Sequence, residues 1–233
     1  MKLLELKQIC EDKGYTLSDE QLKQLDTYAH FLKEYNQKIN LTAIDDYEEV
    51  MEKHFYDSIL PLFHCKIEGS IADIGAGAGF PSIPMKIVHP EIEVTIIEPL
   101  HKRCVFLTQL IEKLGLTKVA IANARAEDYI KEHRESFDYV TARAVANLNV
   151  LAELCIPFVK LKGTFIVMKG QQGEQEYQDA KRAISLLGCE KEEVYFDELT
   201  DGSKRVIFLM KKNRKTPNQY PRVYGQIKKK PLL

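Results

Sequence analysis

A glycine-rich turn at residues 75–79 limits the folds open to this chain more than any other feature. An apolar run ends in Asp73, and Gly75, Gly77 and Gly79 follow at alternate positions. Glycine lacks a Cβ atom, so such a turn adopts positive φ angles easily and lets a ligand lie against its peptide groups. Apolar residues before the turn and a helical pattern after it make a plain surface connector the weaker interpretation. We therefore predict a strand, a ligand-binding turn and a helix.

The spacing of the glycines separates the candidate ligands. A dinucleotide-binding G-x-G-x-x-G motif that starts at Gly75 would need glycine at position 80, where Phe80 stands. Phe80 also takes the place of the second glycine of a G-x-x-x-x-G-K-[ST] phosphate loop. The remaining pattern, D-x-G-x-G-x-G, resembles the S-adenosylmethionine-dependent methyltransferases with a Rossmann-like fold. Asp73, Gly75, Gly77 and Gly79 are therefore candidate cofactor-binding residues.

Three further polar residues follow apolar runs and are candidates for the same site. Glu98 ends the second run, where a carboxylate can accept both ribose hydroxyls, although a solvated acid at a strand end is the alternative. Glu127, after the third run, can accept an adenine amino group, but favourable charge at a helix N-terminus explains it equally well. Arg143, after the fourth run, can bind guanine O6 or the cofactor carboxylate, with an ion pair or phosphate contact as the alternative.

From Ser70 onward, short β-branched runs alternate with helical ones, which is the pattern of βαβ units. We expect an α/β fold of the class I S-adenosylmethionine-dependent methyltransferase type: a Rossmann-like, mostly parallel seven-stranded sheet with helices on both faces. Only turn residues separate the last two strands, so these should form an antiparallel hairpin. The predicted strands lie near 70–74, 92–98, 117–122, 137–141, 163–169, 191–197 and 204–210.

The chain divides by pattern into three parts. Residues 1–65 are expected to form an N-terminal helical extension, with helices near 3–13, from Ser18 to about Tyr35, and near 47–60. Residues 66–212 should form the S-adenosylmethionine-binding methyltransferase core. Residues 213–233 should form a basic C-terminal tail.

The net charge of −1 conceals an uneven distribution. Between Lys211 and Leu233 there are eight basic residues and no acidic one, so residues 1–210 carry 25 basic and 34 acidic side chains. Basic runs neutralise phosphates, and Tyr220 and Tyr224 offer aromatic faces on which bases can stack. The tail therefore predicts a polyanionic partner, with a solubilising tail as the alternative.

Composition favours a cytoplasmic protein with no membrane or metal partner. Apolar residues make up 45% of the chain and charged residues 29%. No apolar run approaches the ~18 residues of a membrane span, and Glu5 and Lys7 interrupt any signal-peptide core. The five cysteines are scattered without C-x-x-C spacing, which predicts buried thiols rather than a zinc site or disulfides. We expect a monomer.

The end of the fourth strand separates the methylation chemistries. Methyltransferases that act on exocyclic amino groups typically carry [Asn/Asp]-Pro-Pro-[Tyr/Phe] there, but this chain has Thr141-Ala-Arg-Ala-Val145. Methylation of pyrimidine C5 needs a cysteine nucleophile, and no cysteine lies at this position. A ring nitrogen with a free lone pair, such as guanine N7, needs neither feature. We assign no catalytic residue, because positioning alone supplies a large rate enhancement.

Several segments together resemble a specific family, the bacterial small-subunit rRNA guanine-N7 methyltransferase G family, also called glucose-inhibited division protein B. The resemblance implies S-adenosylmethionine-dependent methylation of guanine N7 in the 530 loop of 16S rRNA, with the rRNA or the small ribosomal subunit as partner. By position, it places cofactor contacts at Gly75, Phe80, Ala126, Glu127 and Arg143. Many relatives have glycine where this chain has Ser82, which affects local turn geometry. The matching segments are Asp73-Ile-Gly-Ala-Gly-Ala-Gly-Phe-Pro-Ser-Ile-Pro84, Tyr35-Asn with Asn40-Leu-Thr-Ala-Ile44, His54-x-x-Asp57-Ser58, Lys102-Arg103-x-x-Phe106-Leu107, Arg125-Ala-Glu127, Thr141-Ala-Arg-Ala-Val145 and Pro221-Arg-x-x-Gly225.

The remaining expectations concern RNA contacts and the N-terminal extension. We favour phosphate contacts over a solvated helix face for Lys102 and Arg103, which lie close after Glu98. His54 and Asp57 are one helical turn apart and are expected to pin the extension to the sheet. Two other functions stay open, a small-molecule methyltransferase and a non-catalytic RNA-binding assembly factor. In the tail, the candidate RNA-binding residues are Arg222, Lys228, Lys229 and Lys230.

Overall fold

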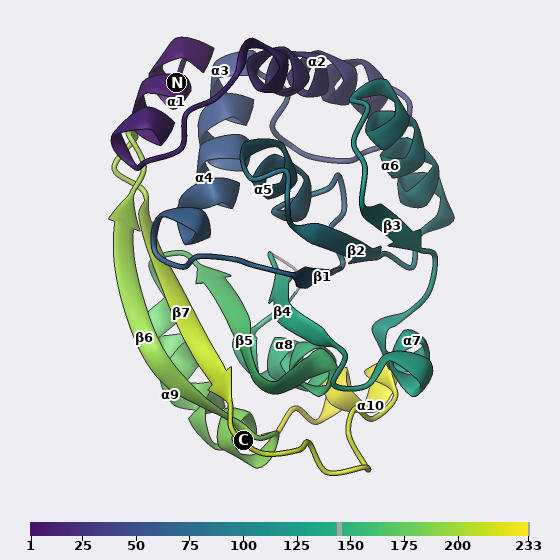
Figure 1. Ribbon diagram of the computed structural model, residues 1–233. Coiled ribbons are helices and arrows are strands. Elements are labelled where there is room, and N and C mark those ends of the chain that lie inside the picture. Colours follow the sequence, from purple (N-terminus) through teal and green to yellow (C-terminus); the bar gives the residue numbers. More distant parts are fainter. Residues whose placement is uncertain (144–145, 233) are drawn as a thin grey trace.

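A seven-stranded sheet with the order β3-β2-β1-β4-β5-β7-β6 forms the centre of the computed structural model, which describes residues 1–143 and 146–232 (Figure 1). Ala144 and Val145, the end of the predicted fourth-strand motif, and Leu233 lie outside the described residues. The strands are β1 (Ser70–Ile74), β2 (Glu93–Ile97), β3 (Val119–Ala122), β4 (Phe137–Ala142), β5 (Val159–Lys169), β6 (Cys189–Glu198) and β7 (Lys204–Lys212).

The pairing of the strands confirms the predicted fold class. Strands β1 to β5 pair in parallel, whereas β7 runs antiparallel to both β5 and β6. The hairpin predicted for the last two strands is therefore confirmed. Because the chain leaves the β3 edge and returns at β4, the order of the strands reverses beside β1. Ligands of open α/β sheets bind at such a switch point, outside the carboxyl ends of the strands.

Both faces of the sheet are covered, which explains the continuous apolar runs of the sequence. Along β5, Ile166 and Met168 join one buried cluster, whereas Phe165 and Val167 join the cluster on the other face. The helices divide in the same way (Figure 1). The first face carries α1 (Leu3–Asp12), α2 (Asp19–Asn36), α5 (Ser82–Val88) and α6 (His101–Lys113), and the second carries α7 (Ala126–His133), α8 (Leu148–Cys155), α9 (Gly173–Leu186) and α10 (Tyr224–Lys229).

The helix predicted over residues 47–60 is not a regular α-helix. It begins as α3 (Tyr47–Glu49), widens to a π-helix over Val50–Tyr56, continues as α4 (Asp57–Ile59) and ends as a 3₁₀ turn over Leu60–Phe63. The apolar spacing of the sequence does not distinguish a π turn from an α turn. Wide turns of this kind are frequent at functional sites, and this one carries His54.

The N-terminal helices share their core with the rest of the protein. Buried side chains of α2, among them Tyr28, lie in the same cluster as Ile83 of α5 and Phe106 of α6. The Tyr28 hydroxyl donates a hydrogen bond of 2.5 Å to the carbonyl oxygen of Ala78 in the glycine turn. The helical extension therefore supports the turn directly. The division at residues 65 and 212 stays a prediction.

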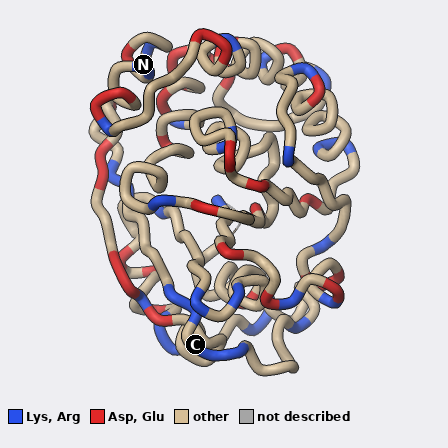
Figure 2. The backbone as a smooth tube through the Cα atoms, viewed as in Figure 1, with Lys and Arg blue, Asp and Glu red and all other residues tan. Residues whose placement is uncertain are grey.

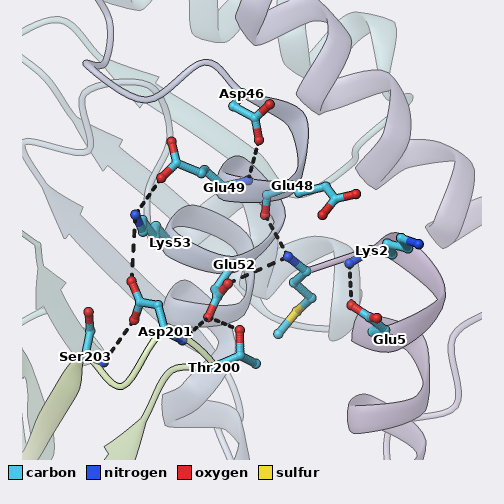
Figure 3. A network of polar contacts seen from close by, with 11 residues as sticks. Lys2, Glu5, Asp46, Glu48, Glu49, Glu52, Lys53, Thr200, Asp201 and Ser203 are labelled. Atoms are coloured by element: carbon cyan, nitrogen blue, oxygen red, sulfur yellow. Dashed lines mark hydrogen bonds and ion pairs between the residues drawn. The ribbon is translucent and has the colours of Figure 1, made fainter.

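A polar network joins the N-terminal helices to the turn between β6 and β7 (Figure 3). The carboxylate of Glu52 accepts hydrogen bonds from the Thr200 hydroxyl and, at 3.1 Å, from the backbone N–H of Asp201. Lys53 lies 2.6 Å from Glu49 and 3.7 Å from Asp201. The π-helix is thus fixed to the turn between β6 and β7.

Candidate cofactor site

A cavity of about 870 Å³ opens at the carboxyl ends of β1, β2 and β4 and beside the residues that follow β3. The glycine turn forms its floor, with Gly75, Gly77 and Phe80 among the lining residues. Residues 97–100 and 123–128 contribute the side that follows β2 and β3. Ligands of open α/β sheets bind outside the carboxyl ends of the strands, and we call this the strand-end rule. In agreement with it, residues that follow four different strands meet at this cavity.

Positive φ angles in the turn explain its glycines. The φ angles are +74° at Gly75, +62° at Gly77 and +101° at Gly79, a region that L side chains rarely adopt. The N–H of Gly75 donates a hydrogen bond of 2.8 Å to the carbonyl oxygen of Ile97, which ties the turn to the end of β2. Gly79 faces the core and not the cavity, because its nearest side chains are those of Ile83 and Tyr28.

Glu98 is buried at the end of β2 and binds the backbone of the glycine turn and of the loop that follows β2. Its Oε2 atom accepts from the N–H of Gly77 at 3.1 Å, and its Oε1 atom accepts from the N–H of Leu100 at 2.9 Å. A carboxylate offers about four acceptor positions, so acceptor capacity remains on a side chain that lines the cavity. This arrangement suits two vicinal ribose hydroxyls.

Asp73 lies behind the turn and does not line the cavity. Its side chain is fully buried, and its Oδ2 atom accepts from the N–H of Ser82 at 3.2 Å. Within residues 1–143 and 146–232, neither Asp73 Oδ1 nor Ser82 Oγ has a hydrogen-bond partner. We predicted Asp73 as a cofactor-binding residue. Its position instead supports a role in holding the start of α5 and the turn.

Replacement of Asp73 by asparagine should flatten the pH dependence of stability. Burial raises the pKa of Asp73 from about 3.8 to about 7. The folded protein then binds this proton more tightly than the unfolded chain, so this contribution is complete below pH ~4 and is lost as the pH rises through ~7. The loss amounts to up to about 1.4 kcal/mol for each pH unit. Asp73→Asn keeps an acceptor for the Ser82 N–H and cannot ionise.

Urea unfolding of both proteins between pH 4 and 8 measures this effect. The free energy of unfolding of Asp73→Asn should rise relative to that of the wild type as the pH increases, and then stay constant above pH ~7. Other titrating groups are common to both proteins and cancel in the difference. A constant difference over the whole range would show that Asp73 does not titrate there.

Phe80 is the centre of a stack of rings at the inner wall of the cavity. Its ring lies 4.4 Å from that of His54 with an interplanar angle of 20°, and 5.6 Å from that of Tyr28. The guanidinium of Arg143 lies 4.8 Å from the centre of the Phe80 ring. Burial, together with the charge of Arg143, lowers the pKa of His54 to about 3, so this imidazole stays neutral at physiological pH.

Arg143 is fixed by an ion pair and does not have a free guanidinium. Its Nη1 atom lies 2.9 Å from Asp57, and its Nη2 atom lies 3.2 Å from Nδ1 of His54. Asp57 also binds Arg205 of β7 at 2.6 Å. The side chains of His54 and Asp57 thus join the extension to β4 and β7. Arg143 still lines the cavity.

Ala126 and Glu127 line the cavity at the start of α7, as the family resemblance implies for cofactor contacts. The Oε1 atom of Glu127 accepts from the backbone N–H of Tyr224 at 3.2 Å. Tyr224, whose ring the sequence predicts as a stacking face for RNA bases, lines the cavity together with Leu154 of α8. No local sequence signal brings a residue so distant in the chain to this site.

The predicted RNA-binding residues differ in their surroundings. Lys102 is exposed, and Arg103 lines the cavity with its Nη1 atom 3.7 Å from Glu98. Figure 2 places basic residues along the segment that leads to the C-terminus. Three of them, Lys228, Lys229 and Lys230, are exposed.

Arg222, a predicted RNA contact, forms an ion pair within the protein, and its contact with RNA stays a prediction. Its Nη2 atom lies 2.6 Å from the buried carboxylate of Glu153, while part of the Arg222 side chain stays exposed. Lys212, counted in the basic run, is fully buried and donates to the carbonyl oxygen of Ile156. The tail packs because Tyr220 and Ile227 are buried among side chains of the second face.

The described residues contain neither a metal-binding cluster nor a membrane-spanning helix. No group of three or more His, Cys, Asp or Glu side chains there is arranged to hold a metal ion. No helix formed by residues 1–143 and 146–232 is long and apolar enough to cross a membrane.

Comparisons of structure show the same fold in two solved proteins. The M. jannaschii TYW2 structure in complex with AdoMet matches with a TM-score of 0.57 and 16% identity over 73% of this chain and 79% of that chain. A single-residue mutant of the 16S rRNA (adenine(1408)-N(1))-methyltransferase from Catenulisporales acidiphilia matches with a TM-score of 0.51 and 15% identity, over 62% of this chain and 85% of the other. These likenesses establish the fold alone.

Comparisons of sequence are more specific. The family described as rRNA small subunit methyltransferase G matches residues 21–211. The ribosomal RNA small subunit methyltransferase G of Oceanobacillus iheyensis is 51% identical over 95% of each chain. That of Listeria monocytogenes serotype 4b is 50% identical, again over 95% of each chain. The resemblance seen in the sequence motifs is thereby confirmed, and the chain belongs to the rRNA small subunit methyltransferase G family.

Proposed function

We propose that this enzyme transfers the methyl group of S-adenosylmethionine to N7 of a guanine in the 530 loop of 16S rRNA. Family membership supports methylation of small-subunit rRNA. The observation that carries the cofactor assignment is the buried Glu98 carboxylate, which holds the glycine turn and keeps acceptor capacity beside the cavity. The choice of N7 rests on the sequence at the end of β4.

The lining residues fit each part of the cofactor. Glu98 would accept the ribose hydroxyls, and Ala126 and Glu127 would meet the adenine base. Gly75 offers a surface without a side chain for the methionine part, next to Phe80 and Arg143. When bound, S-adenosylmethionine supplies an electrophilic methyl group on a sulfonium ion.

Methylation of guanine N7 requires no group that accepts a proton, which fits the side chains at the cavity wall. The N7 lone pair forms the new N–CH₃ bond while the S–CH₃ bond breaks, so no proton leaves and the guanine gains the positive charge that the sulfonium loses. A general base is therefore not needed. His54, with its pKa lowered to about 3, is neutral and is held against Phe80 and Arg143. The task of the protein is then to exclude water and to align the reacting atoms, which can lower the barrier by about 7–11 kcal/mol.

Methyl transfer to ribosomal RNA is the direct test of this proposal. Purified protein with labelled S-adenosylmethionine should label small subunits, assembly intermediates or free 16S rRNA, and 7-methylguanosine should appear in the digested RNA. Glu98→Ala, under the same conditions, serves as the inactive comparison. Label at an exocyclic amine would keep the family but overturn the assignment to N7. Absence of label in all three substrates would overturn the function.

Three further properties belong to the same proposal. We propose that the enzyme acts as a monomer, requires no metal ion and works in the cytoplasm, where the small ribosomal subunit is found. A reaction that forms a bond at a free lone pair needs no Lewis acid, which supports the second property. The molecular mass in solution tests the monomeric state. Methyl transfer in the presence of a chelator tests the independence from metal ions.

Replacement of Lys102, Lys228 and Lys229 by alanine should weaken RNA binding in a salt-dependent way. These exposed side chains are proposed, with Arg103 and Lys230, to contact phosphates near the mouth of the cavity. Each lost phosphate contact reduces the slope of log K against log salt by about 0.7–0.9, so the triple variant should lose about two units. Filter binding to a 530-loop RNA between 50 and 200 mM salt measures the slope.

A matched control comes from α1, at the opposite end of the molecule from α10 (Figure 1). Lys7 lies there on a helix surface, 3.7 Å from Glu11, and Lys7→Ala should keep the wild-type slope. If the triple variant also keeps it, the phosphate contacts lie elsewhere.

A further inference from the structure

The C-terminal segment Arg222–Lys230 is anchored by a buried charge. Glu153 of α8 is fully buried, and Arg222 donates to it from the backbone N at 2.8 Å, from Nε at 2.9 Å and from Nη2 at 2.6 Å. Nη2 also donates to the carbonyl oxygen of Lys230 at 3.0 Å, which closes the segment on itself. A buried carboxylate that loses its partner is strongly destabilising. The buried carboxylate of Glu153 therefore fixes the position of the segment against α8.

Additional contacts on either side fix the path of the segment. Arg134 donates to the carbonyl oxygen of Tyr220 at 2.7 Å and to that of Thr216 at 2.8 Å. Ile227 of α10 is fully buried in the cluster on the second face of the sheet. These anchors hold α10 beside α8, whose Leu154 lines the cavity.

This docking brings one aromatic residue to the cofactor site. Tyr224, the first residue of α10, lines the cavity. Its backbone N–H donates to Oε1 of Glu127, so the position of that carboxylate depends on the position of α10. Glu127 stands after β3, where a carboxylate meets the adenine amino group in the proposed complex. Tyr224 thus stands at the adenine end of the cavity, and the faces of aromatic rings bind bases by stacking.

We propose that the segment Arg222–Lys230 is a wall of the S-adenosylmethionine cavity, in which Tyr224 contacts the adenine base and the Arg222–Glu153 ion pair positions it. The inference rests on the proposed use of this cavity for the cofactor. It changes the role of a segment whose composition indicated only RNA binding. Lys228 and Lys229 lie on the same helix as Tyr224, so one element serves both the cofactor and the proposed RNA contacts.

Calorimetric titration of the full chain with S-adenosylmethionine, without RNA, tests the wall. Tyr224→Ala should raise the Kd about tenfold, because the stacking face is lost. Tyr224→Phe keeps both the ring and the backbone N–H and should stay within about twofold of the wild type. Arg222→Ala should also raise the Kd, because α10 loses its anchor. Gln226→Ala, an exposed position on the same helix, is the matched control and should leave the Kd unchanged.

The unfolding midpoint of each variant separates a cofactor contact from a merely structural role. A structural role would lower the midpoint of Tyr224→Ala and leave the Kd of the folded protein at the wild-type value, which would overturn the proposal. If Arg222→Ala does not fold, the comparison of Tyr224→Ala with Tyr224→Phe decides alone. Wild-type protein that binds no S-adenosylmethionine would overturn the proposed function as well, whereas normal binding by every variant would overturn only the wall.

Discussion

Replacement of Glu98 by alanine is expected to weaken S-adenosylmethionine binding at least about a hundredfold. The carboxylate is proposed to accept two ribose hydroxyls, and hydrogen bonds to a charged group contribute about 1.5–3 kcal/mol each. The same change removes the acceptor for the N–H groups of Gly77 and Leu100. The turn then loses its link to the end of β2, so the cavity floor is less well ordered before the cofactor arrives. Calorimetric titration measures the Kd.

Two other variants define the cause of this loss. In Glu98→Gln, one of the two oxygens that accept from Gly77 and Leu100 becomes an amide NH₂ donor, so one backbone N–H group loses its acceptor. This variant should bind S-adenosylmethionine only somewhat more tightly than Glu98→Ala. Glu93→Ala lies at the exposed start of the same strand and should bind as the wild type does. A Glu98→Ala protein that binds with nearly wild-type affinity would remove the ribose assignment.

Much of the fold was predictable because local and global signals agree. Runs in the central strands, such as β5, are apolar on both sides, as the two buried clusters that β5 joins require. The π-helix over Val50–Tyr56 was not predictable, since its buried positions also fit an α-helix. Nor was the docking of the tail, because Glu153 lies inside an apolar helix and nothing near it in sequence indicates an arginine partner.

The candidate site was predictable as far as the strand-end rule reaches. That rule identified Glu98, Glu127 and Arg143 from the places where apolar runs end, and all three line the cavity. The rule does not determine the direction of a side chain. It therefore did not reveal that Asp73 points behind the turn, where its carboxylate accepts from the N–H of Ser82. Residues from outside the sheet, such as Tyr224, reach the cavity only through long-range packing.

Gly79→Ala is expected to lower the free energy of unfolding by about 3 kcal/mol or more, whereas Gly77→Ala should lower it by only about 1 kcal/mol. Both residues have positive φ, which costs an L residue roughly 1–2 kcal/mol. A Cβ at Gly79 would also lie 2.8 Å from Cγ1 of Ile83 and 2.9 Å from the Tyr28 hydroxyl. Such overpacking adds about 1–3 kcal/mol. At Gly77 nothing lies within 4 Å of the added atom.

The two variants distinguish the glycine that packs against the N-terminal extension, Gly79, from the glycine that lines the cavity, Gly77. Urea unfolding without cofactor should show the large loss only for Gly79→Ala, because only there does the new methyl group push Tyr28 away from the Ala78 carbonyl oxygen. Tyr28→Phe removes that hydrogen bond while keeping the ring, so it should reproduce part of the Gly79→Ala loss. Since Tyr28 belongs to the N-terminal extension, the two effects should be less than additive in the double variant. Equal stabilities for the two glycine variants would mean that the extension does not support the turn at this position.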